Sequence, residues 1–299
     1  MILRQLFRSV HTNYALCYAS NKALLSKLRK KTGYTFLNCK KALDLHDNDM
    51  EKAEQWLNEQ AQSQGWSQAL KLKSRVTSQG LIAMITNNNH GALVEINCET
   101  DFVSRNKKFH DLAQIVLNTV LQHGMTIEQD LLVKKTMLST ESINKLCAND
   151  GKSLKDHSAM TIGLIGENID IRRALCMSVQ PGVHLYGCTH PTPVNPVPSS
   201  YGRYGVLVAL KSDENKEILG MQLCQHIIGM NPVKIGDTKV DIPTDNVDDE
   251  LTMLYQEFLF NPSLCIQELL QTEQVEVLDF VRFEMGENKQ ILDIVETCG

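Results

Sequence analysis

One cysteine in the sequence has the neighbours that a nucleophilic thiol needs. Cys98 directly precedes Glu99, and His90 and His110 lie nearby on either side along the chain. A thiol becomes a catalytic nucleophile when an adjacent base takes its proton and a third group orients that base. Cys98 also ends an apolar run, where cysteines are commonly buried and structural. Two interpretations therefore stay open, a thiol-dependent enzyme and a structural cysteine.

A second group of residues has the chemistry of zinc ligands. His184, Cys188 and His190 lie close together in the stretch HLYGCTH. Structural zinc sites take four ligands, and catalytic ones take three plus a water molecule. No fourth ligand follows nearby, and the flanking Gly187 and Pro191 are typical of turns. We expect no metal and no cofactor.

A phosphate-binding loop is suggested by Gly151-Lys152-Ser153, but the pattern is incomplete. The motif requires a glycine five positions before Gly151, and Leu146 stands there instead. No other common enzyme motif occurs in the chain, which favours a protein without covalent chemistry.

The segment Thr100-Asp101-Phe102-Val103 places an acid beside an aromatic residue, and basic residues follow it. In one interpretation, Phe102 and Val103 pack into the core while Asp101 caps the next turn. In the other, Phe102 is a wedge for the pocket of a partner protein, and Asp101 disturbs charges there. Periodicity alone does not choose between these interpretations.

The elements around this segment are a hairpin and a helix. Residues 80–98 form two apolar runs around an Asn/Gly-rich turn, which predicts strand, turn and strand. Residues 109–120 have apolar side chains at helical spacing. The same order of elements follows later, with strands at 165–179 and 204–211, a proline-rich loop at 190–202, a helix at 219–232 and a strand at 275–286. The pattern predicts an α+β core of two related subdomains with antiparallel sheets, at 80–158 and 159–299.

Residues 22–64 have the spacing of three short helices. The second is predicted to carry Phe36, Cys39 and Leu43 on one side, and Asp47 to Asp49 are predicted to cap the third. Residues 65–79 are polar and basic, and we predict that they form a linker to the core.

Charge and composition restrict the class of partner and the compartment. The chain has 299 residues and a formal net charge of -5, yet residues 1–43 hold nine basic residues and no acid. The acidic remainder disfavours direct nucleic-acid binding. No apolar run is long enough to span a membrane. Residues 1–21 are basic and amphipathic, which predicts a mitochondrial transit peptide, and the nine scattered cysteines favour a reducing compartment. We expect a protein of the mitochondrial matrix.

Several blocks in order resemble the translation elongation factor Ts family, and the match is closest to its mitochondrial branch. The blocks are LRKKTGYTFLNCKKAL, VEINCETDFVSRN, IGENIDIRRA, YGVLVALK and VLDFVRFEMGE. The resemblance covers nearly the whole chain after residue 22. It implies a guanine-nucleotide exchange factor that binds elongation factor Tu. It also implies that the small helical domain at 22–64 has a fold like that of ubiquitin-associated domains.

The family's partner-binding positions map onto residues of this sequence. The resemblance implies that Asp101 and Phe102, between Thr100 and Val103, intrude near the magnesium and phosphate site of Tu. Further contact positions implied by the family are Arg29, Phe36 and Leu37 in the helical domain and Ile165 and His190 in the core.

The sequence also departs from the family's pattern in three places. Residues 32–39 are bulkier and less acidic than the T-G-A-G-M-M-D-C block that is common in the family. The loop that carries His190 is longer, and residues 236–262 leave little room for the coiled-coil arm of bacterial members. A short insertion and a presequence are typical of the mitochondrial branch.

Two rival classes remain. In the first, the helical domain binds ubiquitin-like or other protein ligands and the core is a scaffold without exchange activity. In the second, Cys98 serves a thiol-dependent enzyme. An exchange assay and the variant Cys98→Ser distinguish these classes from an exchange factor.

Overall fold

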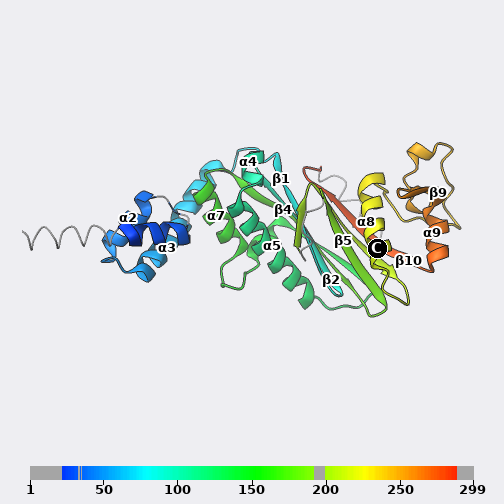
Figure 1. Ribbon diagram of the computed structural model, residues 1–299, viewed down its shortest axis with the longest axis horizontal. Coiled ribbons are helices and arrows are strands. Elements are labelled where there is room, and N and C mark those ends of the chain that lie inside the picture. The colour runs from blue at the N-terminus through cyan, green and yellow to red at the C-terminus, as the bar shows by residue number, and fades with distance from the viewer. Residues whose placement is uncertain (1–21, 33, 35, 192–198, 288–299) are drawn as a thin grey trace, which may run out of the picture.

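The computed structural model describes residues 22–32, 34, 36–191 and 199–287 (Figure 1). The predicted transit peptide at 1–21 lies outside the described residues. Within them, a small helical domain precedes a core of helices and antiparallel sheets. The α+β class predicted from the sequence is confirmed.

The helical domain contains the three helices that the apolar spacing predicts. They are a helix at 22–32, α2 (Phe36–Leu45) and α3 (Met50–Leu72). Asp49 caps α3, because its carboxylate accepts hydrogen bonds from the backbone N–H groups of Glu51 and Lys52. Leu28, Cys39 and Leu43 are fully buried in the core of this domain. Phe36, at the start of α2, is 56% exposed, in contrast to Cys39 and Leu43.

The third helix is longer than the sequence predicts. Residues 65–72 were expected to belong to a polar linker, but they continue α3 to Leu72. The reason is the contact between α3 and α7 (Leu154–Ile165). Gly65 lies so close to α7 that a Cβ atom there would be 2.3 Å from the Ala159 carbonyl oxygen. Packing against the core therefore makes these residues helical despite their polar composition.

A five-stranded sheet forms the first half of the core. Its strand order is β3-β4-β2-β1-β6, with β1 (Gln79–Asn87), β2 (His90–Cys98), β3 (Val133–Leu138), β4 (Ile169–Val179) and β6 (Ser199–Gly202). One face packs against α5 (Lys107–Thr126), α6 (Thr140–Lys145) and α7. The β1–β2 hairpin and α5 confirm the first predicted hairpin and helix. β3 was not predicted from the sequence.

A three-stranded sheet forms the second half of the core, in the order β10-β7-β5. Its strands are β5 (Val183–His190), β7 (Tyr204–Lys211) and β10 (Glu276–Glu284). The outer face packs against α8 (Glu217–Met230) and α9 (Ile266–Glu273). Between these helices lie the 3-10 helices η1 (Val247–Asp249) and η2 (Met253–Tyr255) and the short pair β8 (Glu257–Phe258) and β9 (Asn261–Cys265). Gly187 lies inside β5, so its interpretation as a turn residue was wrong.

The two sheets pack face to face and give the core four layers, helices, sheet, sheet and helices (Figure 1). Apolar residues of both sheets meet between them, among them Ile82, Leu93, Leu207 and Phe283. Since both faces of each sheet are covered, β2 and most of β7 are buried along their length. Buried strands of this kind show no polar alternation in the sequence.

A buried carboxylate links the first sheet to the end of β10. Glu95 on β2 is fully buried and accepts hydrogen bonds from Arg172 Nη1 at 3.1 Å, Arg173 Nε at 2.6 Å and the Gly286 backbone N–H at 2.8 Å. The paired arginines compensate the buried negative charge. This cluster fixes the chain after β10 against β2 and β4.

The core repeats one topology, although the halves divide at a different place from the predicted one. The first half runs β1-β2-α5 and then α7-β4, and its sheet contains the order β4-β2-β1. The second runs β5-β7-α8 and then α9-β10, with the order β10-β7-β5. The predicted boundary between residues 158 and 159 assigned the strand at 165–179 to the second half. That assignment was wrong, because β4 pairs with β2 and closes the first half.

Candidate functional site

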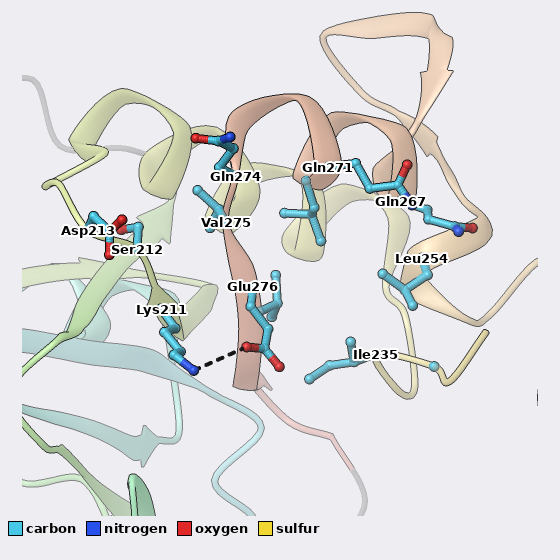
Figure 2. A pocket seen from close by; sticks show the side chains of 13 residues that line it. Lys211, Ser212, Asp213, Ile235, Leu254, Gln267, Gln271, Gln274, Val275 and Glu276 are labelled. Atoms are coloured by element: carbon cyan, nitrogen blue, oxygen red, sulfur yellow. Dashed lines mark ion pairs between the residues drawn. The ribbon is translucent and has the colours of Figure 1, made fainter. Parts of the chain in front are cut away.

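The cavity beside α9 has little catalytic chemistry. It has a volume of about 550 Å³, and Gln267, Gln271 and Gln274 line it from the side of α9 (Figure 2). Lys211 and Glu276 form an ion pair of 3.8 Å at one side. Amide side chains bind ligands but do not transfer protons at neutral pH. None of the site residues predicted from the sequence lines this cavity.

The segment Thr100-Asp101-Phe102-Val103 lies at the connection between β2 and α5. It forms one short helix, α4 (Asp101–Ser104), which Thr100 caps. Asn106 then caps α5, because its side chain accepts a hydrogen bond from the Lys108 N–H at 2.8 Å. Two caps within a few residues define where each helix begins and set the direction of α4.

The structure separates the neighbours Phe102 and Val103. Val103 is 7% exposed and belongs to the core of the first half, whereas the Phe102 side chain is 82% exposed. Burying a Phe side chain is worth about 1.5–3 kcal/mol, and Phe102 forgoes more of this than the other exposed aromatic residues among those described, Phe36 at 56% and Phe260 at 48%. The interpretation that places these residues in the core holds for Val103, whereas Phe102 is exposed, as the other interpretation requires. Val103 anchors α4, and Phe102 points outward.

Asp101 is also at the surface. Its carboxylate lies 3.4 Å from Arg105 Nη2, and both side chains are largely exposed. An exposed pair of this spacing contributes only a few tenths of a kcal/mol to stability. Thr100 takes the capping role that one interpretation gave to Asp101. The Asp101 carboxylate can therefore leave Arg105 and bind another group at a small cost in free energy.

A pair of reciprocal contacts holds the start of α4 against the segment that follows α7. The Glu167 carboxylate accepts hydrogen bonds from the Thr100 N–H at 3.1 Å and from the Thr100 hydroxyl at 2.8 Å. In the opposite direction, the Glu99 carboxylate accepts a bond from the Asn168 N–H at 2.7 Å. Arg75 lies 3.4 Å from the other Glu99 oxygen. The segment that carries α4 and the segment after α7 thus fix each other.

These supporting residues were not predicted from the sequence. Glu99 and Glu167 are far apart along the chain, and nothing in their local spacing shows that each accepts a backbone hydrogen bond from the residue that follows the other. The available signal was that the two motifs NCETDF and IGEN each contain an acid next to a strand or helix end. Acids at such positions commonly accept backbone N–H groups.

Cys98 does not have the environment of a nucleophile. Its thiol is fully buried and donates to the Thr100 carbonyl at 3.2 Å. Burial, with a further contribution from the nearby Glu167 charge, raises the pKa of the Cys98 thiol to about 12. His90 lies at the other end of β2, and the His110 ring nitrogen contacts the Ser104 carbonyl. A thiol that stays protonated at neutral pH is a poor nucleophile.

The possible zinc ligands do not assemble into a site. His184, Cys188 and His190 all lie on β5, where Cys188 is buried and His190 is exposed. Within the described ranges, no group of three or more His, Cys, Asp or Glu residues could hold a metal ion.

Two further predicted contact positions lie at the ends of α7 and β5. Ile165 ends α7 and packs partly against the core, two residues before Glu167. His190 ends β5, and its carbonyl accepts a hydrogen bond from the Arg203 N–H at 2.7 Å, just after β6. On β6, the Tyr201 ring lies 5.1 Å from that of His110, which contacts Ser104 of α4.

The remaining positions lie on the helical domain. Arg29 is exposed on the helix at 22–32, and Phe36 and Leu37, which is 73% exposed, begin α2. This domain reaches the core through α3 and α7. The structure therefore presents two groups of exposed residues, one on the helical domain and one around α4.

Comparison with known proteins agrees with the blocks identified in the sequence. The family model for the N-terminal part of mitochondrial elongation factor Ts matches residues 7–67, and the model for elongation factor TS matches residues 99–250. Mitochondrial elongation factor Ts from Aedes aegypti is 46% identical over 98% of this chain and 98% of its own length. The chain belongs to the elongation factor Ts family.

Other elongation factor Ts proteins match over almost the same extent. The mitochondrial protein from Drosophila melanogaster is 41% identical over 97% of this chain and 95% of its own, and that from Homo sapiens is 40% identical over 97% and 92%. The resemblance to elongation factor Ts is therefore confirmed, as is the role in translation elongation. The predicted localisation in the mitochondrial matrix is also confirmed. In the part of the chain that the structure describes, no helix has the length and apolar character to cross a membrane.

Proposed function

We propose that the chain is the guanine-nucleotide exchange factor for mitochondrial elongation factor Tu. It binds Tu·GDP and promotes the release of GDP without covalent chemistry. Membership of the elongation factor Ts family supports this role. The single observation that carries it is the solvated Phe102 side chain on the anchored helix α4.

The physics of GDP binding explains how an exposed aromatic residue can act on it. A GTPase holds the phosphates with backbone N–H groups of a loop and with a magnesium ion that bridges phosphate and protein oxygens. The affinity depends on the position of those groups to within a fraction of an ångström. In this proposal Phe102 enters Tu and shifts a helix that supports the magnesium and phosphate site. Asp101 perturbs the polar contacts there.

Such a wedge has to be rigid, and the contacts of Thr100 and Glu99 provide the rigidity. A mobile loop would lose conformational entropy on binding, which would reduce the free energy available to displace GDP. The bonds from Thr100 to Glu167 and from Asn168 to Glu99 fix α4 before the partner arrives. Binding energy can then be used to deform Tu.

The other predicted positions serve to fix the orientation of Tu on the chain. Arg29, Phe36 and Leu37 form one contact group on the helical domain, and Ile165 and His190 extend the group around Thr100 to Val103. Two separate groups restrict the orientation of the partner more than one would. Exchange is then a coupling free energy, so GDP weakens the binding of this chain to Tu by the same factor by which the chain weakens GDP.

The direct test is the release of a fluorescent GDP analogue from organellar Tu, measured by stopped flow with and without the full chain. We expect the chain to accelerate release in proportion to its concentration until Tu is saturated. Cys98→Ser should retain the acceleration, whereas a thiol-dependent enzyme would lose its activity. Binding of Tu without any acceleration would favour the alternative, a non-exchange interaction module that uses the exposed Phe36 and Leu37 of the helical domain.

A further inference from the structure

The helix that carries Phe102 is too short to hold its own direction. α4 has four residues, and its turn closes through the Ser104 N–H, which donates to the Thr100 carbonyl at 3.2 Å. A single helical turn fixes several dihedral angles for very few hydrogen bonds, so it is not stable by itself. The contacts of Thr100 with Glu167 hold the first end of α4. The other end depends on a different contact.

His110 supplies that contact. Its ring Nε2 lies 2.8 Å from the carbonyl oxygen of Ser104, the last residue of α4. A carbonyl oxygen can only accept, so Nε2 carries a hydrogen and donates it. Carbonyl groups in the last turn of a helix have no partner within the helix. The imidazole therefore satisfies one of these groups and ties the end of α4 to the beginning of α5.

The backbone of His110 is a rigid base for this donor. His110 lies in the first turn of α5, a helix of 20 residues, and its N–H donates to the Asn106 carbonyl at 3.1 Å. Its neighbour Phe109 is fully buried in the core of the first half. The start of α5 is thus fixed to the sheet below it, and His110 extends from it to α4.

The ring of Tyr201, on β6, restricts the imidazole of His110. The two ring centres lie 5.1 Å apart, with the ring planes tilted by 55°. The Tyr201 hydroxyl donates to the Gln114 side-chain oxygen at 2.6 Å, and Gln114 lies one turn after His110 on α5. A side chain that is already restricted by its neighbours loses little conformational entropy when it forms a hydrogen bond. The bond to Ser104 is therefore prepared before any partner binds.

We propose that His110 is a positioning residue for nucleotide exchange. Its donation to the Ser104 carbonyl fixes the second end of α4, and Phe102 lies between this end and the end that Glu167 fixes. A helix held at both ends keeps the direction of its exposed side chain, whereas a helix held at one end can pivot. This inference rests on the proposed exchange function and adds to it the residue that aims Phe102.

Two substitutions separate the hydrogen bond of His110 from the packing of its ring. In His110→Gln, the amide nitrogen is as many bonds from Cα as Nε2 is, so it can donate to the same carbonyl without a ring. In His110→Phe, a ring remains beside Tyr201 but cannot donate. If His110 only fills space, the second variant is the better replacement. If it positions α4, the first one is.

The experiment measures the release of a fluorescent GDP analogue from organellar Tu at increasing concentrations of the full chain. We expect His110→Gln to keep the maximal rate of the unaltered chain. His110→Phe should lower that rate by about fivefold, which corresponds to about 1 kcal/mol, the usual contribution of one hydrogen bond. The concentration that gives half of the maximal rate should change less, because the proposed contacts on the helical domain are unaltered.

Two controls accompany these variants. His123→Phe makes the same substitution in the last turn of α5, away from α4, and should leave the maximal rate unchanged. His110→Asn has an amide one carbon shorter than His110→Gln and should lose the rate as His110→Phe does, which provides a second test if the latter fails to fold. All folded variants should unfold within about 4 °C of the unaltered chain.

Three results would overturn the inference. They are a full maximal rate with folded His110→Phe or His110→Asn, an equal loss with His110→Gln and His110→Phe, or a loss with His110→Gln alone. The last result would assign His110 to ring packing. If the unaltered chain does not accelerate GDP release, the exchange proposal fails and this inference fails with it, whereas the three results above overturn this inference alone.

Discussion

The two halves of the core share a topology but differ at one connection. In the first half, the chain between β2 and α5 forms α4 and exposes Phe102. In the second half, the equivalent chain between β7 and α8 is residues 212–216, SDENK, without an aromatic residue. There the Tyr186 hydroxyl bonds to Asn215 at 2.7 Å and to the Lys216 N–H at 3.0 Å, which holds the connection against the sheet. The same topology therefore occurs in both halves, and the proposed function depends on the connection in the first half.

The helices that precede the last strand of each half differ as well. α7 is covered by α3, which joins the helical domain to the first half. The equivalent α9 instead borders the open, glutamine-lined cavity in the second half (Figure 2). Both groups of proposed contacts with Tu are therefore tied to the first half, with His190 alone contributed by the second sheet.

The largest effect is expected from removing the carboxylate that anchors α4. Glu167→Ala removes two charge-assisted hydrogen bonds to Thr100 and should lower the free energy of unfolding by about 3 kcal/mol. GDP release should slow with it, because α4 loses its fixed position. Denaturant unfolding and the stopped-flow assay measure the two effects. Glu217→Ala, an acid at the start of α8 in the second half, is the matched control, and an equal loss in both variants would show that α4 is not specially anchored.

A smaller effect is expected at the contact between α3 and α7. Gly65→Ala would place a Cβ atom 2.3 Å from the Ala159 carbonyl and should cost about 2 kcal/mol. Gly229→Ala is the control in α8, because its Cβ would meet only Leu259 at 3.5 Å. That variant should be neutral or stabilise the protein by a few tenths of a kcal/mol, since alanine favours helices. Thermal unfolding that shows the same change for both variants would contradict the close packing of α3.

The smallest effect concerns acid stability of the second half. Burial lowers the pKa of His226 to about 4, and its ring nitrogens contact Gln256 and the Leu259 N–H. Between pH 6.5 and 4 the unfolded chain binds a proton that the folded chain does not, so stability falls as pH falls. The loss from pH 7 to pH 5.5 should be about 1 kcal/mol. His226→Gln should reduce this slope in denaturant titrations, and an unchanged slope would assign the acid sensitivity to other groups.

The sequence predicted the elements that carry a strong pattern. The hairpin at 80–98, the capped third helix and the position of the segment 100–103 follow from turn residues, Asp49 and helical spacing. β5 was missed because Gly187 is typical of turns, and its close packing against Met84 of the first sheet cannot be seen in the sequence. β3 was missed because its lysines make the segment look polar, although it forms a strand that pairs with β4 at the sheet edge.

The site could be predicted only in part. Spacing identified the acid and aromatic pair, but a helix as short as α4 has too little periodicity to show that Val103 is inside and Phe102 outside. The anchors Glu99 and Glu167 depend on contacts between segments that are distant in the sequence. Only the folded core brings those segments together.

The central claim is that the connection in the first half, and not its equivalent in the second, drives exchange. It is tested by the rate of GDP release from organellar Tu with Phe102→Ala and with Ile218→Ala, which alters a side chain of the second half that is 79% exposed. We expect Phe102→Ala to lower the stimulated rate by about tenfold or more, which corresponds to about 1.4 kcal/mol. Ile218→Ala should stimulate release as the unaltered chain does, and both variants should unfold at the same temperature as that chain. Full stimulation by a folded Phe102→Ala variant would contradict the account.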